Sequence, residues 1–181
     1  MSDFEKAKQY FFEGLLFLER ENFLQAEECF LNSLAIAPNR VSTLTNLSVV
    51  QLKLEKYSEA SITARNAIAL DEGNSEAFLN LGLIEKDVKN IPQAIEYFNR
   101  ALMLNSKYPE AWLSKGALLN QLKQYQEAIV HYDKAISLKP NYAEAWSNKG
   151  VTLHELKRYE EAIVHQDKAI SLNTNYAEAF Y

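Results

Sequence analysis

The same kind of segment begins six times in this chain, and successive starts are 34 residues apart. The five complete frames are 7–40, 41–74, 75–108, 109–142 and 143–176, and a partial sixth covers 177–181. No gap or insertion is needed to keep this register. A fixed period of this length is typical of an array of small structural units and not of a single enzyme core.

Large and small residues recur at fixed positions of the frame. The fourth position holds a large residue: Tyr10, Leu44, Phe78, Trp112, Trp146 and Phe180. The eighth holds Gly14, Ser48, Gly82, Gly116 and Gly150, and the twentieth is alanine in every complete repeat. Small residues at helical spacing let two helices approach closely, and the large residue fills the remaining space. Each frame therefore predicts two helices, which must pack against neighbouring pairs to cover their apolar faces.

Frame 109–142 carries the most complete pattern: Trp112, Gly116, Leu119, Ala128, Tyr132, Ala135 and Pro140. This pattern resembles the tetratricopeptide repeat family, and the resemblance extends over essentially the whole chain. It implies an all-α fold, a right-handed α-solenoid superhelix of antiparallel helix pairs, with residues 1–181 forming a single solenoid domain. Ser48 replaces the glycine, and Ala64 and Gln166 replace an aromatic residue. We expect a looser last repeat because of Gln166.

Composition narrows the class of function. The formal net charge of −5 and pI of about 5.3 argue against binding to nucleic acid phosphates. No apolar run approaches membrane-spanning length, so we expect no membrane insertion. One cysteine, Cys29, has no partner for an internal disulfide, and a cytoplasmic location follows as the default. No phosphate-binding loop, nucleophile elbow or metal-ligand set is found, so we expect no cofactor, no metal and no enzyme activity.

A candidate binding groove follows from the helical period. On each first helix, the fifth, sixth, ninth and twelfth positions lie away from the residues that build the core, so we expect them to line the concave surface. In the tetratricopeptide repeat family this surface is the usual peptide groove. The apolar candidates are Phe11, Leu15, Leu18, Val49, Leu52, Leu79, Leu83 and Leu113. The alternative is that the fifth and ninth positions pack partly against the next repeat.

Asparagine recurs at the sixth position, as Asn46, Asn80 and Asn148. An amide both donates and accepts, so such a ladder could hold the backbone of an extended peptide. It is similar to the asparagine ladder of O-linked N-acetylglucosamine transferases, whereas a solvated helix face is the plainer explanation. The carboxylate clamp known in the family is absent here, since Phe11, Leu15 and Glu76 occupy its positions.

The leading hypothesis is a noncatalytic adaptor whose partner is a protein or peptide held in the concave groove. The alternative is the targeting region of a larger enzyme, such as a glycosyltransferase. Self-assembly is the third alternative, because Val151 and Leu172 would be uncovered at the end of the array. Either the chain continues, or this uncapped C-terminal end forms a homo-oligomer. If Glu144 lines the groove, the C-terminal half would favour a basic ligand.

Overall fold

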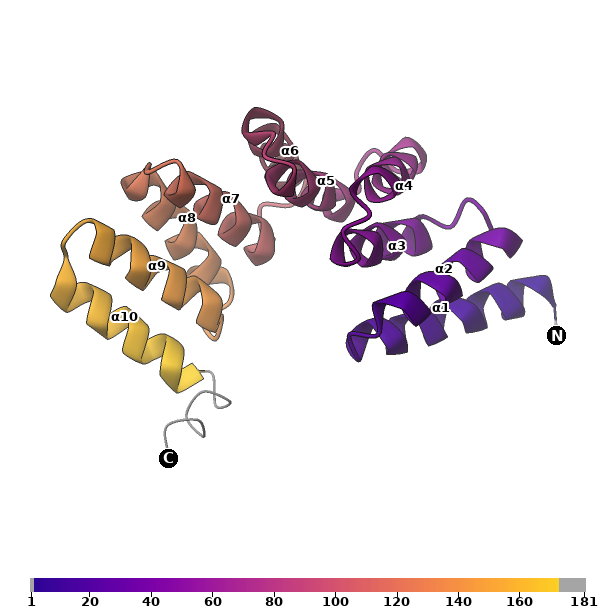
Figure 1. Cartoon of the computed structure of the whole chain (residues 1–181), viewed down its shortest axis with the longest axis horizontal. Helices are drawn as coiled ribbons and strands as arrows, with labels where there is room; N and C mark the ends of the chain where they lie inside the picture. Colours follow the sequence, from indigo (N-terminus) through magenta and orange to yellow (C-terminus); the bar gives the residue numbers. More distant parts are fainter. Residues whose placement is uncertain (1, 173–181) are drawn as a thin grey trace. The chain divides into compact units, whose positions relative to one another are not determined.

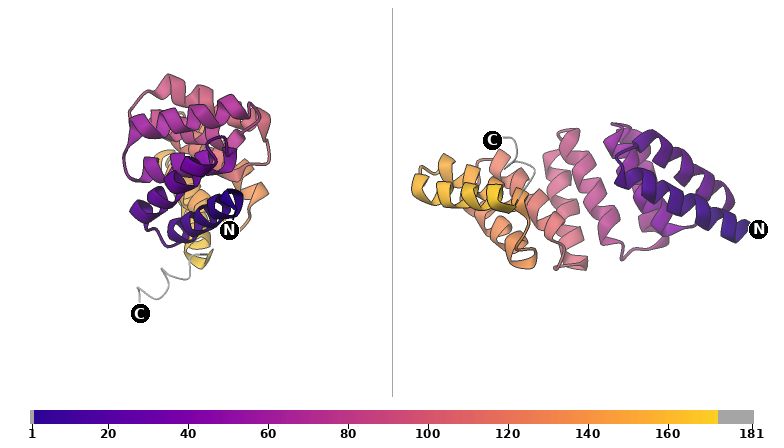
Figure 2. Two further views of the ribbon diagram at one scale, coloured as in Figure 1. Left: turned by 90° about the vertical axis from the view of Figure 1, so that its right-hand side faces the viewer. Right: turned by 90° about the horizontal axis from the view of Figure 1, so that it is seen from below.

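The computed structural model describes residues 2–172, and these contain ten α-helices and no strand. The partial sixth repeat predicted at 177–181 lies outside the described residues. The chain divides into two compact units, Met1–Leu104 and Asn105–Tyr181. The two views of Figure 2 show that the described chain is helical throughout. The prediction of an all-α helical-repeat fold is confirmed.

The helices follow one another as antiparallel pairs joined by short turns (Figure 1). The first unit contains α1 (Asp3–Glu19), α2 (Phe23–Ile36), α3 (Val41–Lys53), α4 (Tyr57–Leu70), α5 (Ser75–Asp87) and α6 (Ile91–Leu104). The second unit contains α7 (Pro109–Gln121), α8 (Tyr125–Leu138), α9 (Ala143–Glu155) and α10 (Tyr159–Leu172). Each odd-numbered helix is the first helix of a pair, and each even-numbered helix is the second.

The turn inside each pair uses the same backbone device. Five residues have positive φ between 55° and 63°, and none of them is glycine: Glu21, Glu55, Lys89, Lys123 and Lys157. In the first pair, the N–H of Asn22 donates to the carbonyl of Phe17, and the N–H of Glu21 donates to that of Leu18. These two bonds satisfy carbonyl groups that the end of α1 would otherwise leave unpaired. The turn therefore ends the first helix at a fixed residue in every repeat.

Within a pair, the glycine of the first helix lies directly against a large side chain of the second. The close pairs are Gly14 with Phe30, Gly82 with Phe98, and Gly116 with Tyr132. A Cβ atom at Gly82 would lie 2.5 Å from the ring of Phe98, which is too close for real atoms. In the second repeat the pair is Ser48 with Ala64, so a larger first-helix residue faces a smaller partner. The departures from the repeat pattern at these two positions thus compensate each other.

We predict that Gly82→Ala destabilises the first unit by about 1–3 kcal/mol, because the buried Phe98 ring has no room to move. Gly150→Ala is the matched control, since its nearest neighbour is the flexible end of Gln166, 3.0 Å away. There the added helix propensity should hold the change within about 1 kcal/mol of zero, or make it stabilising. Urea denaturation followed by circular dichroism measures both, and equal losses in the two variants would contradict this explanation.

A buried hydroxyl lies where neighbouring repeats meet. Thr43 is fully buried on α3, at the frame position where Ala77 and Ala145 are also fully buried. Its hydroxyl oxygen has no hydrogen-bond partner among the described residues. Thr152 is equally buried, but its hydroxyl donates to the carbonyl of Asn148 at 2.8 Å. A buried polar group without a partner destabilises the fold, whereas a satisfied one does not.

We predict that Thr43→Val raises the free energy of unfolding by about 1 kcal/mol, because it removes an unpaired polar atom and keeps the side-chain shape. Thr152→Val should lower it by a similar amount, about 1 kcal/mol, because it removes a hydroxyl that is hydrogen-bonded. Denaturant midpoints of the two variants give the comparison. Loss of stability at both sites would show that the Thr43 hydroxyl is satisfied by ordered water.

Candidate functional site

The predicted site residues all lie on first helices, and these helices contact one another within each unit: α1 with α3, α3 with α5, and α7 with α9. All of them except Leu113 and Asn148 belong to the first unit. We call the partly exposed side chains of α1, α3 and α5 the first-helix surface. It consists of Leu15, Leu18, Asn46, Val49, Leu52 and Leu83, each partly buried.

Four of the predicted residues are buried and not exposed: Phe11, Leu79, Asn80 and Leu113, all between 4% and 9% exposed. Three of these are at the fifth position of the frame, and two of them, Phe11 and Leu113, pack against the next repeat as the alternative proposed. The Phe11 ring lies 6.0 Å from that of Phe30, and the guanidinium of Arg40 lies 4.6 Å from its centroid. Phe11 also packs with Leu47 and Val50 of α3, so contacts within and between repeats leave little of its side chain exposed to a ligand.

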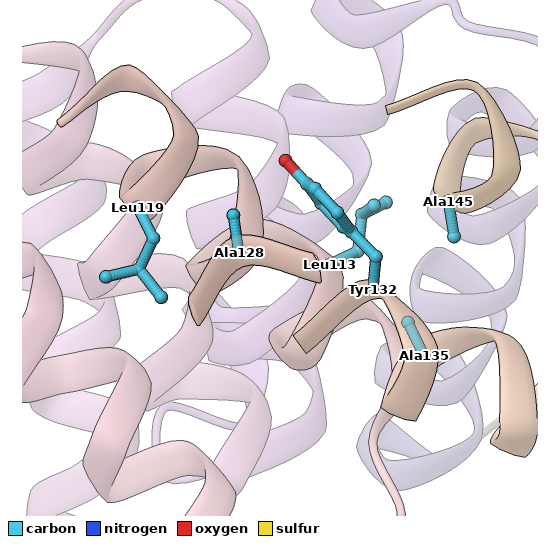
Figure 3. Close-up of a cluster of buried hydrophobic side chains, with 6 residues drawn as sticks. All are labelled: Leu113, Leu119, Ala128, Tyr132, Ala135 and Ala145. Atoms are coloured by element: carbon cyan, nitrogen blue, oxygen red, sulfur yellow. The ribbon is translucent and has the colours of Figure 1, made fainter. Parts of the chain in front are cut away.

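The cluster that contains Leu113 shows how this burial arises. In Figure 3 the Tyr132 side chain lies at the centre, with Ala145 of α9 on one side and Leu119 and Ala128 on the other. Burial raises the pKa of Tyr132 to about 12, so its hydroxyl stays neutral in the core. One aromatic ring thus joins both helices of a repeat to the next first helix.

The three asparagines of the predicted ladder differ from one another. Asn80 is buried, and its amide donates to the Ser48 hydroxyl at 2.8 Å and to the Thr45 carbonyl at 3.2 Å. Asn46 is partly exposed, and its amide donates to the Ser42 carbonyl of its own helix at 2.8 Å. Asn148 is partly exposed and lines a hollow on the second unit with Glu144 and Ser147. Asn80 therefore joins two repeats, and the expectation that it lies open for a peptide is wrong.

We predict that Asn80→Ala lowers the free energy of unfolding by about 1–3 kcal/mol, since two buried hydrogen bonds are lost. Asn46→Ala should change it by less than about 0.5 kcal/mol, because that side chain is partly exposed and bonds only within its own helix. Thermal and urea denaturation of the two variants test this assignment. A stable Asn80→Ala variant would return Asn80 to the list of binding residues.

Two exposed side chains of α1 were missed by the sequence prediction. Phe12 and Leu16 are about half exposed, and with Leu15, Leu18 and Glu19 they line a shallow hollow of about 550 Å³. At the frame position of Leu16, Val50 and Ile84 are almost fully buried because an earlier repeat covers them. No helix pair precedes α1 in the described chain. Comparing the first repeat with the later ones would have revealed this exposure.

Two of the histidines pack against tryptophan rings. His131 lies against the Trp112 ring, with centroids 5.3 Å apart, and His165 lies against Trp146 at 5.4 Å. Burial lowers the pKa of His131. Burial, with the carboxylates of Glu13 and Glu28, raises the pKa of the Cys29 thiol, which opposes formation of a reactive thiolate. The described residues contain no group of three or more potential metal ligands.

The helix pairs, their 34-residue recurrence and the small-residue contacts define an α-helical repeat protein. Models of the tetratricopeptide repeat match residues 75–108 and 143–176, and a TPR repeat model matches residues 116–157. Together these matches extend over more than half of the chain. The chain belongs to the tetratricopeptide repeat family.

Solved structures agree with this assignment. The crystal structure of MamA has a TM-score of 0.71 and 25% identity, with 91% of this chain and 96% of that chain covered. YrrB, described as a TPR protein with an unusual peptide-binding site, has a TM-score of 0.64 and 23% identity, covering 94% and 88%. PilF of Pseudomonas aeruginosa has a TM-score of 0.80 and 22% identity, covering 97% and 85%. YrrB and PilF, at 23% and 22% identity, show a likeness of fold alone. No curated protein sequence matched the chain.

Domains of this family bind proteins or peptides in general and are noncatalytic interaction modules as a rule. The chain is accordingly a protein-interaction scaffold in this broad sense. Within the described part, no helix has both the length and the apolar content required to cross a bilayer.

Proposed function

We propose that this chain is a noncatalytic adaptor that binds a peptide or partner protein on the first-helix surface. The observation that carries this proposal is the row of partly exposed apolar side chains on three adjacent helices. They are Leu15 and Leu18 on α1, Val49 and Leu52 on α3, and Leu83 on α5. An apolar strip that neighbouring repeats leave partly open is the kind of surface on which partners bind.

The chemistry of the surface indicates the kind of ligand. Phe12 and Leu16 extend the apolar strip at its α1 end, and both are about half exposed. The amide oxygen of Asn46 accepts no hydrogen bond from the described residues, so it is available to a backbone N–H of a ligand. A segment with apolar side chains and a free backbone edge fits these groups best. The single free cysteine, Cys29, suits a reducing cytoplasmic setting, which is part of this proposal.

The targeting region of a larger enzyme is the alternative function, and the asparagine ladder and the partial sixth repeat are the features that suggest it. Because the Asn80 amide is engaged by Ser48 and Thr45, that ladder is interrupted. The adaptor proposal needs only the apolar strip and Asn46. We therefore favour the adaptor.

We predict that Val49→Glu combined with Leu83→Glu weakens the binding of peptides selected on the wild-type chain by at least about tenfold, because two carboxylates would be desolvated in the complex. Both residues are only partly buried, whereas Leu79 is 5% exposed and its replacement would disturb the fold. A displayed library of extended peptides supplies the ligands, and fluorescence anisotropy measures their affinities.

The matched control is Ile62→Glu, which adds the same charge at a side chain that is 61% exposed on the second helix α4. This variant should bind the selected peptides as the wild type does. Circular dichroism confirms that each variant keeps its helix content. If the double variant binds the same peptides with unchanged affinity, the first-helix surface is not the binding site.

A further inference from the structure

One face of α9 and α10 is apolar and uncovered. Ile163 is 61% exposed, whereas its counterpart 34 residues earlier, Ile129, is 8% exposed. Ile170 is 50% exposed, while its counterpart Ile136 is partly buried. We call this surface the end face, and define it by Val151, His154, Tyr159, Ile163, Asp167 and Ile170. Its exposed apolar side chains need a cover that the described chain does not supply.

The structure shows what covers the equivalent face of α7 and α8, since α9 packs there. The ammonium of Lys149 lies 2.6 Å from the carboxylate of Asp133, and the Lys149 side chain is only 16% exposed. Three residues later, the Thr152 hydroxyl lies 3.1 Å from the amide oxygen of Asn120. A basic residue followed by a small hydroxyl side chain thus provides the polar contacts.

The apolar contacts come from the same helix. Leu153, 1% exposed, packs with Ile129 and Ala162, and Leu156 adjoins the same cluster. The segment that covers α7 and α8 therefore presents a definite pattern. The basic residue is Lys149, and Thr152 and Leu153 follow it by three and four positions. Leu156 follows it by seven positions.

The end face repeats the groups that receive this pattern. Asp167 is the counterpart of Asp133, His154 of Asn120, and Ile163 of Ile129. Asp167 is exposed and forms no ion pair with the residues that the structure describes. A hollow of about 480 Å³ lies at these groups, lined by Gly150, Val151, His154, Tyr159, Ala162, Ile163, Gln166 and Asp167. Its apolar lining and the carboxylate of Asp167 suit a helix with an apolar stripe and one cation.

We propose that the end face binds a partner helix with the pattern that α9 presents to α8, namely a Lys or Arg followed by Thr three positions later and by Leu four and seven positions later. The cation pairs with Asp167, and the apolar side chains cover Ile163 and Val151. This site is separate from the first-helix surface and does not depend on it.

A second copy of the chain does not fit this face in the repeat register. Its α1 would bring Glu13 to the place of Lys149, so that two carboxylates would meet at Asp167. Gln9 would take the place of Ala145, which is fully buried, so a polar amide would have to be buried there. Like charge and the burial of a polar side chain both oppose self-assembly through these two ends, so the occupant is a helix of different chemistry.

The test uses a fluorescently labelled peptide of residues 143–158, which contains the α9 pattern, and the full chain as receptor. The peptide should bind saturably by anisotropy. Lys149→Glu in the peptide should weaken binding about five- to tenfold, because an ion pair becomes a repulsion. Asp167→Lys in the protein should weaken binding of the wild-type peptide and restore binding of the Lys149→Glu peptide.

Ile163→Glu and Ile62→Glu form a matched pair of protein variants, since both isoleucines are 61% exposed on second helices. Only Ile163→Glu should abolish binding of the α9 peptide, and neither should alter the helix content. Equal binding of the two peptides, or no binding by the wild-type chain, overturns the proposal. Light scattering that shows concentration-dependent assembly lost in Ile163→Glu would assign the face to a second copy instead. Binding only by a chain shortened to residue 172 would assign it to residues 173–181.

Discussion

The close approach of two helices across a glycine is the contact on which the rest of this structure depends. Because Gly14, Gly82 and Gly116 carry no Cβ, an aromatic ring of the partner helix can lie on the backbone itself. The ring then reaches the next repeat, as Tyr132 reaches Ala145. The small residue thus determines how closely the two helices of a pair approach and how one pair packs on the next. This packing in turn determines which side chains stay exposed to a ligand.

Much of the fold could be predicted from the sequence, because a 34-residue period identifies the helix pairs and the residues that face one another. The candidate site was less predictable. Helical period alone assigned Phe11, Leu79 and Leu113 to an open surface, but all three are buried in the structure. The helical period shows which residues of one helix share a face. The exposure of those residues depends on how closely neighbouring helices approach, and that distance is set by the side-chain volumes on those helices.

The hydrogen bonds of the buried polar side chains could not be predicted from the sequence for a related reason. Asn80 resembles Asn46 and Asn148 in the frame, yet only Asn80 is buried and bonded to Ser48. Ser48 itself could be recognised as a departure from glycine, but its compensation by Ala64 and its bond to Asn80 needed three dimensions. The positive-φ turn residues escaped notice as well, because glutamate and lysine occupy positions where glycine would have been an obvious signal.

The Ser48–Asn80 hydrogen bond has a consequence for how such a chain can evolve. Recombination between near-identical repeats deletes or multiplies whole units, and the frames 109–142 and 143–176 are similar enough for such exchange. Loss of the frame 75–108 would instead bring Ser114 to the place of Asn80, and the bonds that the Asn80 amide donates to Ser48 and Thr45 would be lost. Deletion of the third module would therefore remove a polar contact from the second.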